Sequence, residues 1–275
     1  YYLSYSPLTI LVKLTMEIDT LTRLIITVSV FSCFASLELL YPNRTAHTEK
    51  PKRWFANLGI FFVTLLVVGI PIGVFSLGLL AYSESRGWGL MNVLDLPNWV
   101  EVIIGFLLLD ALLYFQHRLS HSLPILWRLH RVHHADTEMD VTTANRIHPL
   151  ETCWLIFLRT IFCILLGIPL LALELYLIAL SVVSIFNHTN VRLPIQAEKW
   201  ISKLLVTPLM HETHHSAEVE DFDTNFSFLF SFWDRCFGTY REQPVAKASQ
   251  ITFGINQFRE KNEISVGKLL TQPFR

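Results

Sequence analysis

The sequence has few charged residues and no excess of either sign. Lys and Arg together number 22, Asp and Glu 23, and charged residues make up 16% of the 275 residues, against about 25% in an ordinary soluble protein. This balance offers nucleic acid no basic surface, so we expect no nucleic-acid partner. Low charge with a mean hydropathy of +0.41 instead predicts a protein of the lipid bilayer.

Cysteine and glycine are also scarce. The four cysteines show no CxxC spacing, which argues against a disulfide framework, a zinc ribbon or an iron–sulfur motif. The 11 glycines form neither a GxGxxG motif nor a Gly/Ser-rich linker, and no repeat divides the chain, so we expect a single structural domain. The opening residues lack the basic region and cleavage site of a signal peptide, so none is expected.

Long apolar runs are abundant. Crossing about 30 Å of hydrocarbon takes roughly 20 helical residues. Five runs approach that length: Leu24–Tyr41, Phe55–Tyr82, Trp99–Gln116, Thr152–Gly167 and Pro169–Asn187. Gly–Ile–Pro separates the last two runs, which predicts a tight hairpin. The fold class is therefore predicted to be all-α, an integral membrane helical bundle of about four to five membrane helices or half-spans.

Basic residues near these runs indicate their orientation. The connection after the first run carries Arg44, Lys50, Lys52 and Arg53, whereas the connection after the second carries Arg86 alone. Because Lys and Arg gather in cytoplasmic loops, the first connection is predicted to be cytoplasmic. The third run then ends on that side, and the hairpin begins and ends there. We expect a cytoplasmic helical cap and a multi-pass membrane location.

Histidines collect at the predicted cytoplasmic ends of the runs. Eight of the 11 histidines lie in three stretches, "HRLSH" at 117–121, "HRVHH" at 130–134 and "HETHH" at 211–215. Spacings of three and four residues bring the rings onto one face of a helix. Neutral imidazole binds zinc, copper, iron and nickel, and eight unliganded rings would repel one another once protonated. Eight ligands exceed the six positions of one octahedral ion, so two ions are predicted.

The histidine motifs fit two further kinds of metal protein, a zinc hydrolase and a metal transporter or sensor. "HETHH" matches the HExxH pattern of zinc hydrolases through His211, Glu212 and His215, although that site leaves five cluster histidines unexplained. A histidine-rich metal transporter or sensor is the other alternative. Transporters place ionisable ligands near mid-membrane, whereas these clusters lie at the ends of the runs.

The sequence around the histidines resembles the membrane-bound di-iron fatty acid hydroxylase and sterol desaturase superfamily. The resemblance rests on the three histidine motifs and on the stretches "LLLDALLYFQHRLSH", "VHHADTEMDVTTANRIHPLE", "FNHTNVRLP" and "DTNFSFLFSFWDRCFGTY". It covers roughly Asp110 to Tyr240, with weaker likeness in "LELLYP" and "RWFANLGI". We divide the chain into N-terminal membrane helices (1–100), a fatty acid hydroxylase-like catalytic region (101–245) and a C-terminal tail (246–275).

The resemblance implies an O₂-dependent enzyme that hydroxylates or desaturates a lipid-like substrate from the bilayer, such as a sterol or a fatty acyl chain. Two iron ions are implied, and zinc can replace them in overexpressed protein. An external electron donor is implied too, a cytochrome b5-like protein or a ferredoxin with its reductase. The implied ligands are His117, His121, His130, His133, His134, His188, His211, His214 and His215.

Other residues are expected to support this site. Ring N–H groups of ligating histidines usually donate to carboxylates or carbonyls. The candidate acceptors are Asp136, Glu138, Asp140, Glu151, Asp221 and Asp223. Asn225 is expected to orient a ligand or a water, and His148 to line the site or form hydrogen bonds rather than bind metal.

Asp110 differs from these residues because it lies inside an apolar run, where a charge is costly and marks a paired or functional position. We expect Asp110 either to pair with Arg159 or to bond a ligand on another helix. Three aromatic residues near the cytoplasmic ends, Trp127, Trp154 and Phe186, are expected to line the substrate's path or to pack at the membrane interface.

Overall fold

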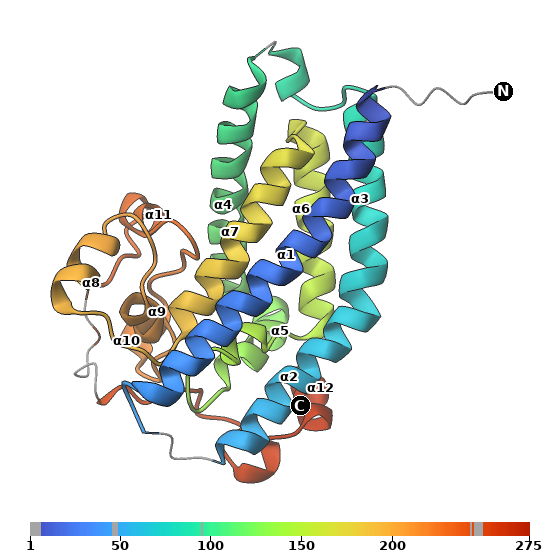
Figure 1. Cartoon of the computed structure of the whole chain (residues 1–275). Coiled ribbons are helices and arrows are strands. Elements are labelled where there is room, and N and C mark those ends of the chain that lie inside the picture. Colours follow the sequence, from blue (N-terminus) through green and yellow to red (C-terminus); the bar gives the residue numbers. More distant parts are fainter. Residues whose placement is uncertain (1–6, 46–48, 95, 243, 245–249) are drawn as a thin grey trace.

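The structure is a computed structural model that describes residues 7–45, 49–94, 96–242, 244 and 250–275, with side chains from residue 22 onward (Figure 1). His47, which the sequence places in the basic loop, lies outside the described residues. The described chain is helical apart from two isolated β-bridges, and the predicted all-α membrane bundle is confirmed.

Seven long and five short helices are described. The long helices are α1 (Pro7–Leu40), α2 (Lys50–Thr64), α3 (Ile70–Ser85), α4 (Asn98–Ser122), α5 (Pro124–His134), α6 (Pro149–Leu166) and α7 (Leu170–His188). The short helices are α8 (Ile195–Ile201), α9 (Pro208–His214), α10 (Val219–Phe222), α11 (Phe232–Cys236) and α12 (Val266–Thr271). Single turns occur at η1 (Leu65–Gly69), η2 (Met91–Val93), η3 (Thr143–Asn145), η5 (Lys261–Glu263) and η6 (Gln272–Phe274).

Five helical segments are long and apolar enough to cross a membrane, so the chain is a multi-pass membrane protein. They are Thr22–Leu40, Lys50–Ser85, Asn98–Ser122, Pro149–Leu166 and Leu170–His188. The second spans 36 residues, or about 54 Å at 1.5 Å per residue. That length exceeds the hydrocarbon layer, so the segment tilts or extends beyond it.

Two local features shape these segments. Pro71 follows the π-helical turn η1 within the second segment; its ring removes a helix hydrogen bond and widens the turn. Gly167 ends α6 in the left-handed conformation, with φ of 70°, and α7 begins three residues later. The predicted hairpin is confirmed there, and only glycine adopts this conformation at little cost.

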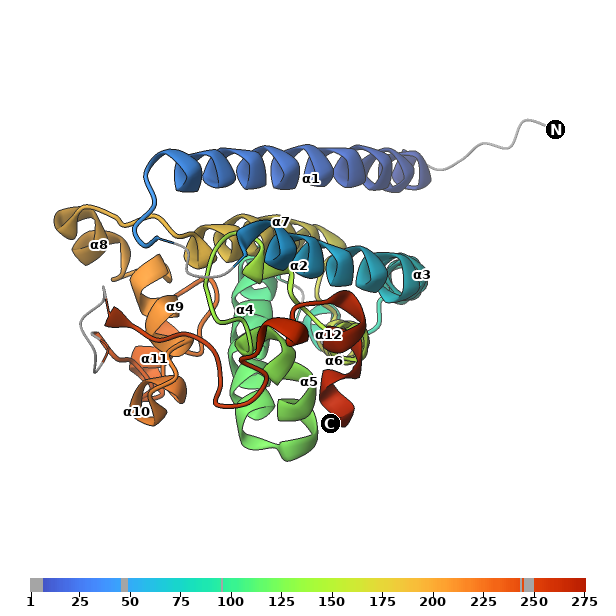
Figure 2. The same cartoon turned by 90° about the horizontal axis from the view of Figure 1, so that it is seen from below.

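The arrangement brings all the histidine motifs to one end of the bundle (Figure 1). Helix α4 packs against α7, α3 against α6, and α1 against α7 at the edge of the bundle (Figure 2). Helix α5 turns back under α4, while α8 to α11 form a cap beside the same end. The C-terminal α12 packs on α2.

The core changes character along the bundle. Away from the histidine end it is apolar, with Leu109, Ala172, Leu173 and Tyr176 in one cluster. At the histidine end, charged and polar side chains are buried beside small apolar clusters. Because buried polar groups require partners, their hydrogen bonds determine how this end is held together.

Candidate metal centre

Nine histidines form two compact groups. The five-histidine group contains His117, His121, His130, His134 and His214. The four-histidine group contains His133, His188, His211 and His215. Within each group, one candidate ligand atom from every residue lies within 4.8 Å of all the others. The five-histidine group draws on α4, α5 and α9, and the four-histidine group on α5, α7 and the end of α9.

Helix geometry explains why the rings converge. Helix α5 begins at Pro124, directly after Leu123 ends α4 in an extended conformation, so the chain turns sharply and α5 faces α4. Proline suits the first turn of a helix, where its missing N–H has no partner to lose. Helix α9 begins in the same way at Pro208, where Thr207 Oγ1 accepts from the backbone N–H of Met210 at 3.4 Å.

In the five-histidine group the Nε2 atoms face one another. His134 is central, with its Nε2 atom 3.1 Å from His130, 3.2 Å from His121 and 3.1 Å from His214. Nε2 of His117 lies 3.0 Å from that of His130. Two nitrogens that bind one ion at about 2.1 Å and at right angles are separated by about 3.0 Å.

The four-histidine group has the same spacing around His188. Its Nε2 atom lies 3.1 Å from Nε2 of His133 and 3.0 Å from Nε2 of His211. His215 completes the group, with its ring centroid 4.6 Å from that of His133 and 4.8 Å from that of His211. All four side chains are buried.

Hydrogen bonds to the backbone fix the proton positions on several rings. Three Nδ1 atoms lie 2.7 Å from a carbonyl oxygen: His117 with Phe226, His188 with Ser184, and His214 with Thr224. A carbonyl only accepts, so Nδ1 carries the proton and Nε2 presents a lone pair. Lone pairs that face each other at about 3 Å repel unless a cation lies between them. The donor set therefore fits metal ions.

The rings outside the membrane segments are held in the neutral form that binds metal. Burial, reinforced by the neighbouring histidines, lowers the pKa of His133, His134, His211 and His215 well below the usual value. Burial also lowers the pKa of His214, to about 3, against the opposing effect of its bond to Thr224. Neutral imidazole is the ligand form at neutral pH.

Comparison with known proteins identifies the family that carries this arrangement. Residues 102–239, half of the chain, match the fatty acid hydroxylase family. The chain belongs to this family. The match contains all nine histidines and leaves α1, α2 and α3 outside it.

Relatives of this chain are named for different lipid substrates. The ornithine lipid hydroxylase OlsE of Rhizobium tropici is 29% identical over 155 residues, 56% of this chain and 46% of the relative. The alkylglycerol monooxygenase of Xenopus tropicalis is 25% identical over 256 residues, 80% of this chain and 55% of the relative. The very-long-chain aldehyde decarbonylase GL1-11 of Oryza sativa subsp. indica is 26% identical over 185 residues, 66% of this chain and 67% of the relative.

The chain spans about half the length of the first two relatives. No solved structure gives a significant match to it.

Two of the expected carboxylates lie beside ring nitrogens of the five-histidine group. His130 Nδ1 donates to Glu151 Oε1 at 2.6 Å, with both side chains buried. Nδ1 of His121 lies 3.4 Å from Asp223 Oδ1, and the Asp223 side chain is 66% exposed. The first distance is a short, charge-assisted hydrogen bond, whereas the second is longer than one.

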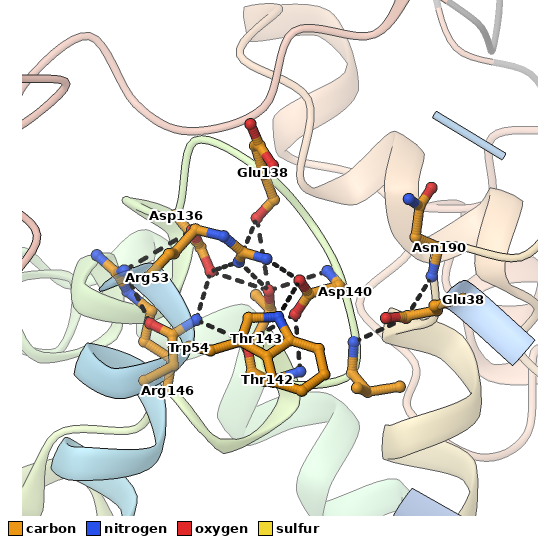
Figure 3. A network of polar contacts seen from close by, with 12 residues as sticks. Glu38, Arg53, Trp54, Asp136, Glu138, Asp140, Thr142, Thr143, Arg146 and Asn190 are labelled. Carbon is orange, nitrogen blue, oxygen red and sulfur yellow. Dashed lines mark hydrogen bonds and ion pairs between the residues drawn. The ribbon is translucent and has the colours of Figure 1, made fainter. Parts of the chain in front are cut away.

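The expectation that Asp136 and Asp140 accept from ligand rings is wrong. Arg53 Nη1 donates to Asp136 Oδ2 at 2.7 Å, and Arg53 Nη2 donates to Asp140 (Figure 3). Asn57 and Thr143 donate to Asp136 at 2.9 Å each. Burial alone would raise the pKa of Asp136, but the nearby arginines and these hydrogen bonds hold it below its usual value. The loop after α5 is thereby tied to α2.

The other two expected acceptors, Glu138 and Asp221, make contacts with arginines. Glu138 contributes its backbone oxygen, 3.3 Å from Arg53 Nη1. Asp221 pairs with Arg241 Nε at 2.9 Å.

Asp110 has neither of its expected partners. Its carboxylate accepts from Trp233 Nε1 at 2.8 Å, from the backbone N–H of Phe230 at 3.2 Å and from the Tyr176 hydroxyl at 3.3 Å. No ion pair with Arg159 is found among the described residues, and no ligand histidine contacts Asp110. Neutral donors stabilise this carboxylate. Two of them, Phe230 and Trp233, lie just before and within α11, so Asp110 ties this part of the chain to α4.

Asn225 and His148 also act away from the rings. Asn225 has a φ of 52° and donates to the carbonyls of Met210 and Arg241 at 3.1 and 2.9 Å. His148 Nδ1 accepts from the backbone N–H of Leu150 at 3.2 Å, while its Nε2 lies 3.1 Å from the Leu270 carbonyl. The hydrogen-bonding role expected of His148 agrees with these contacts, and His148 belongs to neither histidine group.

Glu212 of the HExxH pattern points away from the rings. Its carboxylate pairs with Arg44 Nη1 at 2.7 Å, and the side chain is buried. A zinc hydrolase requires this glutamate beside the metal as a general base. An ion pair with Arg44 leaves it unsuited to that role.

A small cavity of about 60 Å³ contacts both histidine groups. Its lining contains His117 and His130 of the five-histidine group and His133 and His188 of the four-histidine group. The remaining lining residues are Leu113, Gln116, Ser120, Ala144, Ile147, Glu151, Leu155, Ser184 and Phe228.

The aromatic residues expected along the substrate's path do not line this cavity. Trp127 packs on His121 and His134, with ring centroids 5.3 and 5.7 Å apart. Phe186 packs on Phe34 on α1, at 5.8 Å, and Trp154 lies 6.3 Å from Phe157. Phe228, which lies within a quoted motif, is the aromatic residue that contacts the cavity.

Residues on α1 and α2 were missed as parts of the site. Glu38 and Asn57 are buried at the histidine end, as is Arg53, and they belong to "LELLYP" and "RWFANLGI". The available signal was a glutamate in an apolar run, which is costly unless it has partners.

Proposed function

We propose that this chain is an O₂-dependent di-iron oxidoreductase that hydroxylates or desaturates a membrane lipid. The observation that carries the proposal is the convergence of nine ring nitrogens into two groups, each within 4.8 Å. The lone pairs that face one another within these groups require cations. Iron, when bound, supplies the redox chemistry with O₂ that zinc and amino-acid side chains lack.

The chain's own residues would hold and orient the two ions. The five-histidine group would hold one ion and the four-histidine group the other. Glu151 and the Phe226, Thr224 and Ser184 carbonyls fix the orientation of four ligand rings by accepting their N–H protons. Such partners typically change metal affinity by about 10- to 100-fold.

The cavity is the proposed place of the reacting C–H bond. It contacts histidines from both groups, and Leu113 and Leu155 line it from α4 and α6, two membrane segments. An apolar lining excludes water and suits a hydrocarbon chain. A lipid would therefore enter sideways from the bilayer and present one short stretch of chain to the ions.

The metal centre is proposed to face the cytoplasm. The end of α1 and the start of α2 lie at the same end of the bundle as α5 and α9 (Figure 1). Arg44, Lys50, Lys52 and Arg53 belong to this part of the chain, and the positive-inside rule assigns such a basic end to the cytoplasm. A cytoplasmic electron donor, a cytochrome b5-like protein or a ferredoxin with its reductase, would then have access to this end.

Lipids with a polar headgroup are the first substrates to test, because the relatives are named for ornithine lipid and alkylglycerol. Lipid extracts of host cells that express the wild-type chain would be compared with extracts from cells expressing His133→Ala. We expect one lipid to gain an oxygen atom or lose two hydrogens with the wild-type chain alone. Identical lipid profiles would contradict the proposal.

Metal analysis of the purified protein, combined with oxygen consumption in the presence of an electron donor, separates this function from the hydrolase. Two ions per chain and lipid-dependent oxygen uptake support the oxidoreductase. A single zinc ion without oxygen uptake, accompanied by ester or peptide hydrolysis that Glu212→Gln abolishes, would favour the hydrolase instead.

A further inference from the structure

Polar contacts join helix α1 to both ends of α7. Near the start of α7, Arg23 on α1 pairs with Glu174 at 2.7 Å. Just beyond the end of α7, Glu38 on α1 accepts from Thr189 and Asn190. Both links bury a glutamate, but only the second lies beside a histidine of the proposed metal centre.

One oxygen of Glu38 accepts hydrogen bonds from three donors in two loops. Glu38 Oε1 accepts from the backbone N–H of Asn190 at 2.7 Å and from that of Val141 at 2.9 Å (Figure 3). It also accepts from the Thr189 hydroxyl at 3.1 Å. The side chain is 1% exposed. Hydrogen bonds to a buried carboxylate are stronger than those between neutral groups, so this one oxygen holds the two loops together.

Each of the two loops follows a helix that carries a member of the four-histidine group, and α5 also carries His130 and His134 of the five-histidine group. Thr189 directly follows His188, the last residue of α7. Val141 lies in the loop after α5, and α5 supplies His133. Arg53 ties this loop to α2 through its ion pair with Asp136. Nε2 atoms of His133 and His188 lie 3.1 Å apart. The five-histidine group, in contrast, takes no ligand from α7.

We propose that Glu38 is a positioning residue for the four-histidine group, and this inference rests on the proposed metal centre. Its carboxylate fixes the end of α7 against the loop after α5 and thereby sets His188 opposite His133. Helix α1 lies outside the matched family region and supplies no ligand, yet it completes one of the two groups.

The test measures the release of iron(II) from purified, anaerobically loaded protein into a chromogenic chelator. Wild type should release two ions per chain. In Glu38→Ala, one ion should leave about tenfold faster while the other keeps its wild-type rate. Glu38→Gln should release both ions at close to the wild-type rates, because its amide oxygen still accepts hydrogen bonds.

Glu174→Ala is the matched control, since it removes the other buried glutamate that links α1 and α7. Its release rates should match wild type. Equal acceleration in Glu174→Ala and Glu38→Ala would show that α1 acts only by general packing and would overturn the inference, as would unchanged release in Glu38→Ala. Acceleration of both ions in Glu38→Ala would also contradict it.

A gentler variant covers the case in which Glu38→Ala fails to accumulate. Thr189→Val removes one donor to Glu38 and keeps the side-chain volume. It should accelerate release of the same single ion about threefold. That change corresponds to about 0.7 kcal/mol, which is close to the net worth of about 1 kcal/mol of one hydrogen bond. No acceleration in Thr189→Val would overturn the inference in that case. Wild type that binds no iron at all would refute the metal centre itself, which is a different result from equal release in the variants.

Discussion

The two histidine groups use the same ligand but differ in how their rings are held. In the five-histidine group, His117, His130 and His214 donate a ring N–H to a carbonyl or a carboxylate. In the four-histidine group, only His188 has such an acceptor among the described residues. Nδ1 of His133, Nδ1 of His211 and Nε2 of His215 are buried without a hydrogen-bond partner there.

This difference indicates that the groups depend on different parts of the chain. The five-histidine group is supported locally, because Glu151, Thr224 and Phe226 accept directly from its rings. The four-histidine group lacks most of these direct acceptors and depends on the placement of whole helices, through contacts such as that of Glu38. A ligand whose ring is not oriented by an acceptor generally holds metal less tightly.

The largest expected effect comes from removing the central ring. His134→Ala deletes the nitrogen that three other Nε2 atoms face at 3.1–3.2 Å, so lipid oxidation should fall by more than about 100-fold and the five-histidine group should lose its ion. Metal content and product formation would be measured together. Retention of two ions in His134→Ala would contradict the assignment of this group.

His148→Ala is the matched control for that substitution. It removes a buried histidine of the same motif region that belongs to neither group and bonds Leu150 and Leu270 instead. It should keep both ions and lose about 1–2 kcal/mol of folding stability through its lost hydrogen bonds.

Glu151→Gln tests the local support of the five-histidine group. The substitution keeps the side-chain size but removes the charge that accepts the His130 N–H at 2.6 Å. Affinity for that ion should fall by about 10- to 100-fold, while the four-histidine ion is retained. Competition with a chelator of known affinity measures the change, and equal weakening of both ions would remove the distinction between the groups.

The sequence predicted most of the fold and the nine histidines that gather in the two groups, but it did not predict the partners that hold them in place. Apolar runs and the Gly–Ile–Pro hairpin predicted all five membrane segments, because helix length and hydropathy are properties of contiguous residues. Helical spacing likewise predicted that His130, His133 and His134 share a face. It did not reveal that His133 and His134 would point to different groups.

The partners of the buried charges depended on long-range packing. Asp136 and Arg53 are separated by 83 positions, and Asp110 meets Trp233 across 123, so no local pattern connects them. Backbone carbonyls such as that of Phe226 were also invisible in the sequence, since every residue has one. The expectation of carboxylate acceptors therefore succeeded at Glu151 and failed at Asp136.

The release rates of the two ions from the wild-type protein test the difference between the two histidine groups directly. Fewer ring acceptors in the four-histidine group predict that its ion leaves first, about tenfold faster than the other. Release into excess chelator should show two phases, and His215→Ala should remove the fast one. Loss of the slow phase in His215→Ala would reverse the order that the hydrogen bonds predict.

The smallest effect is expected at Asp223. Like Glu151, it was expected to accept a ring N–H, but its contact with the ring is longer and more exposed. Its carboxylate lies 3.4 Å from His121 Nδ1, and its side chain is 66% exposed. Water screens such a contact, which is therefore worth little. Asp223→Asn should change the affinity of the five-histidine ion by less than about threefold, measured beside Glu151→Gln under the same chelator. A loss as large as that in Glu151→Gln would mean that charge near the rings, rather than a buried hydrogen bond, holds the ion.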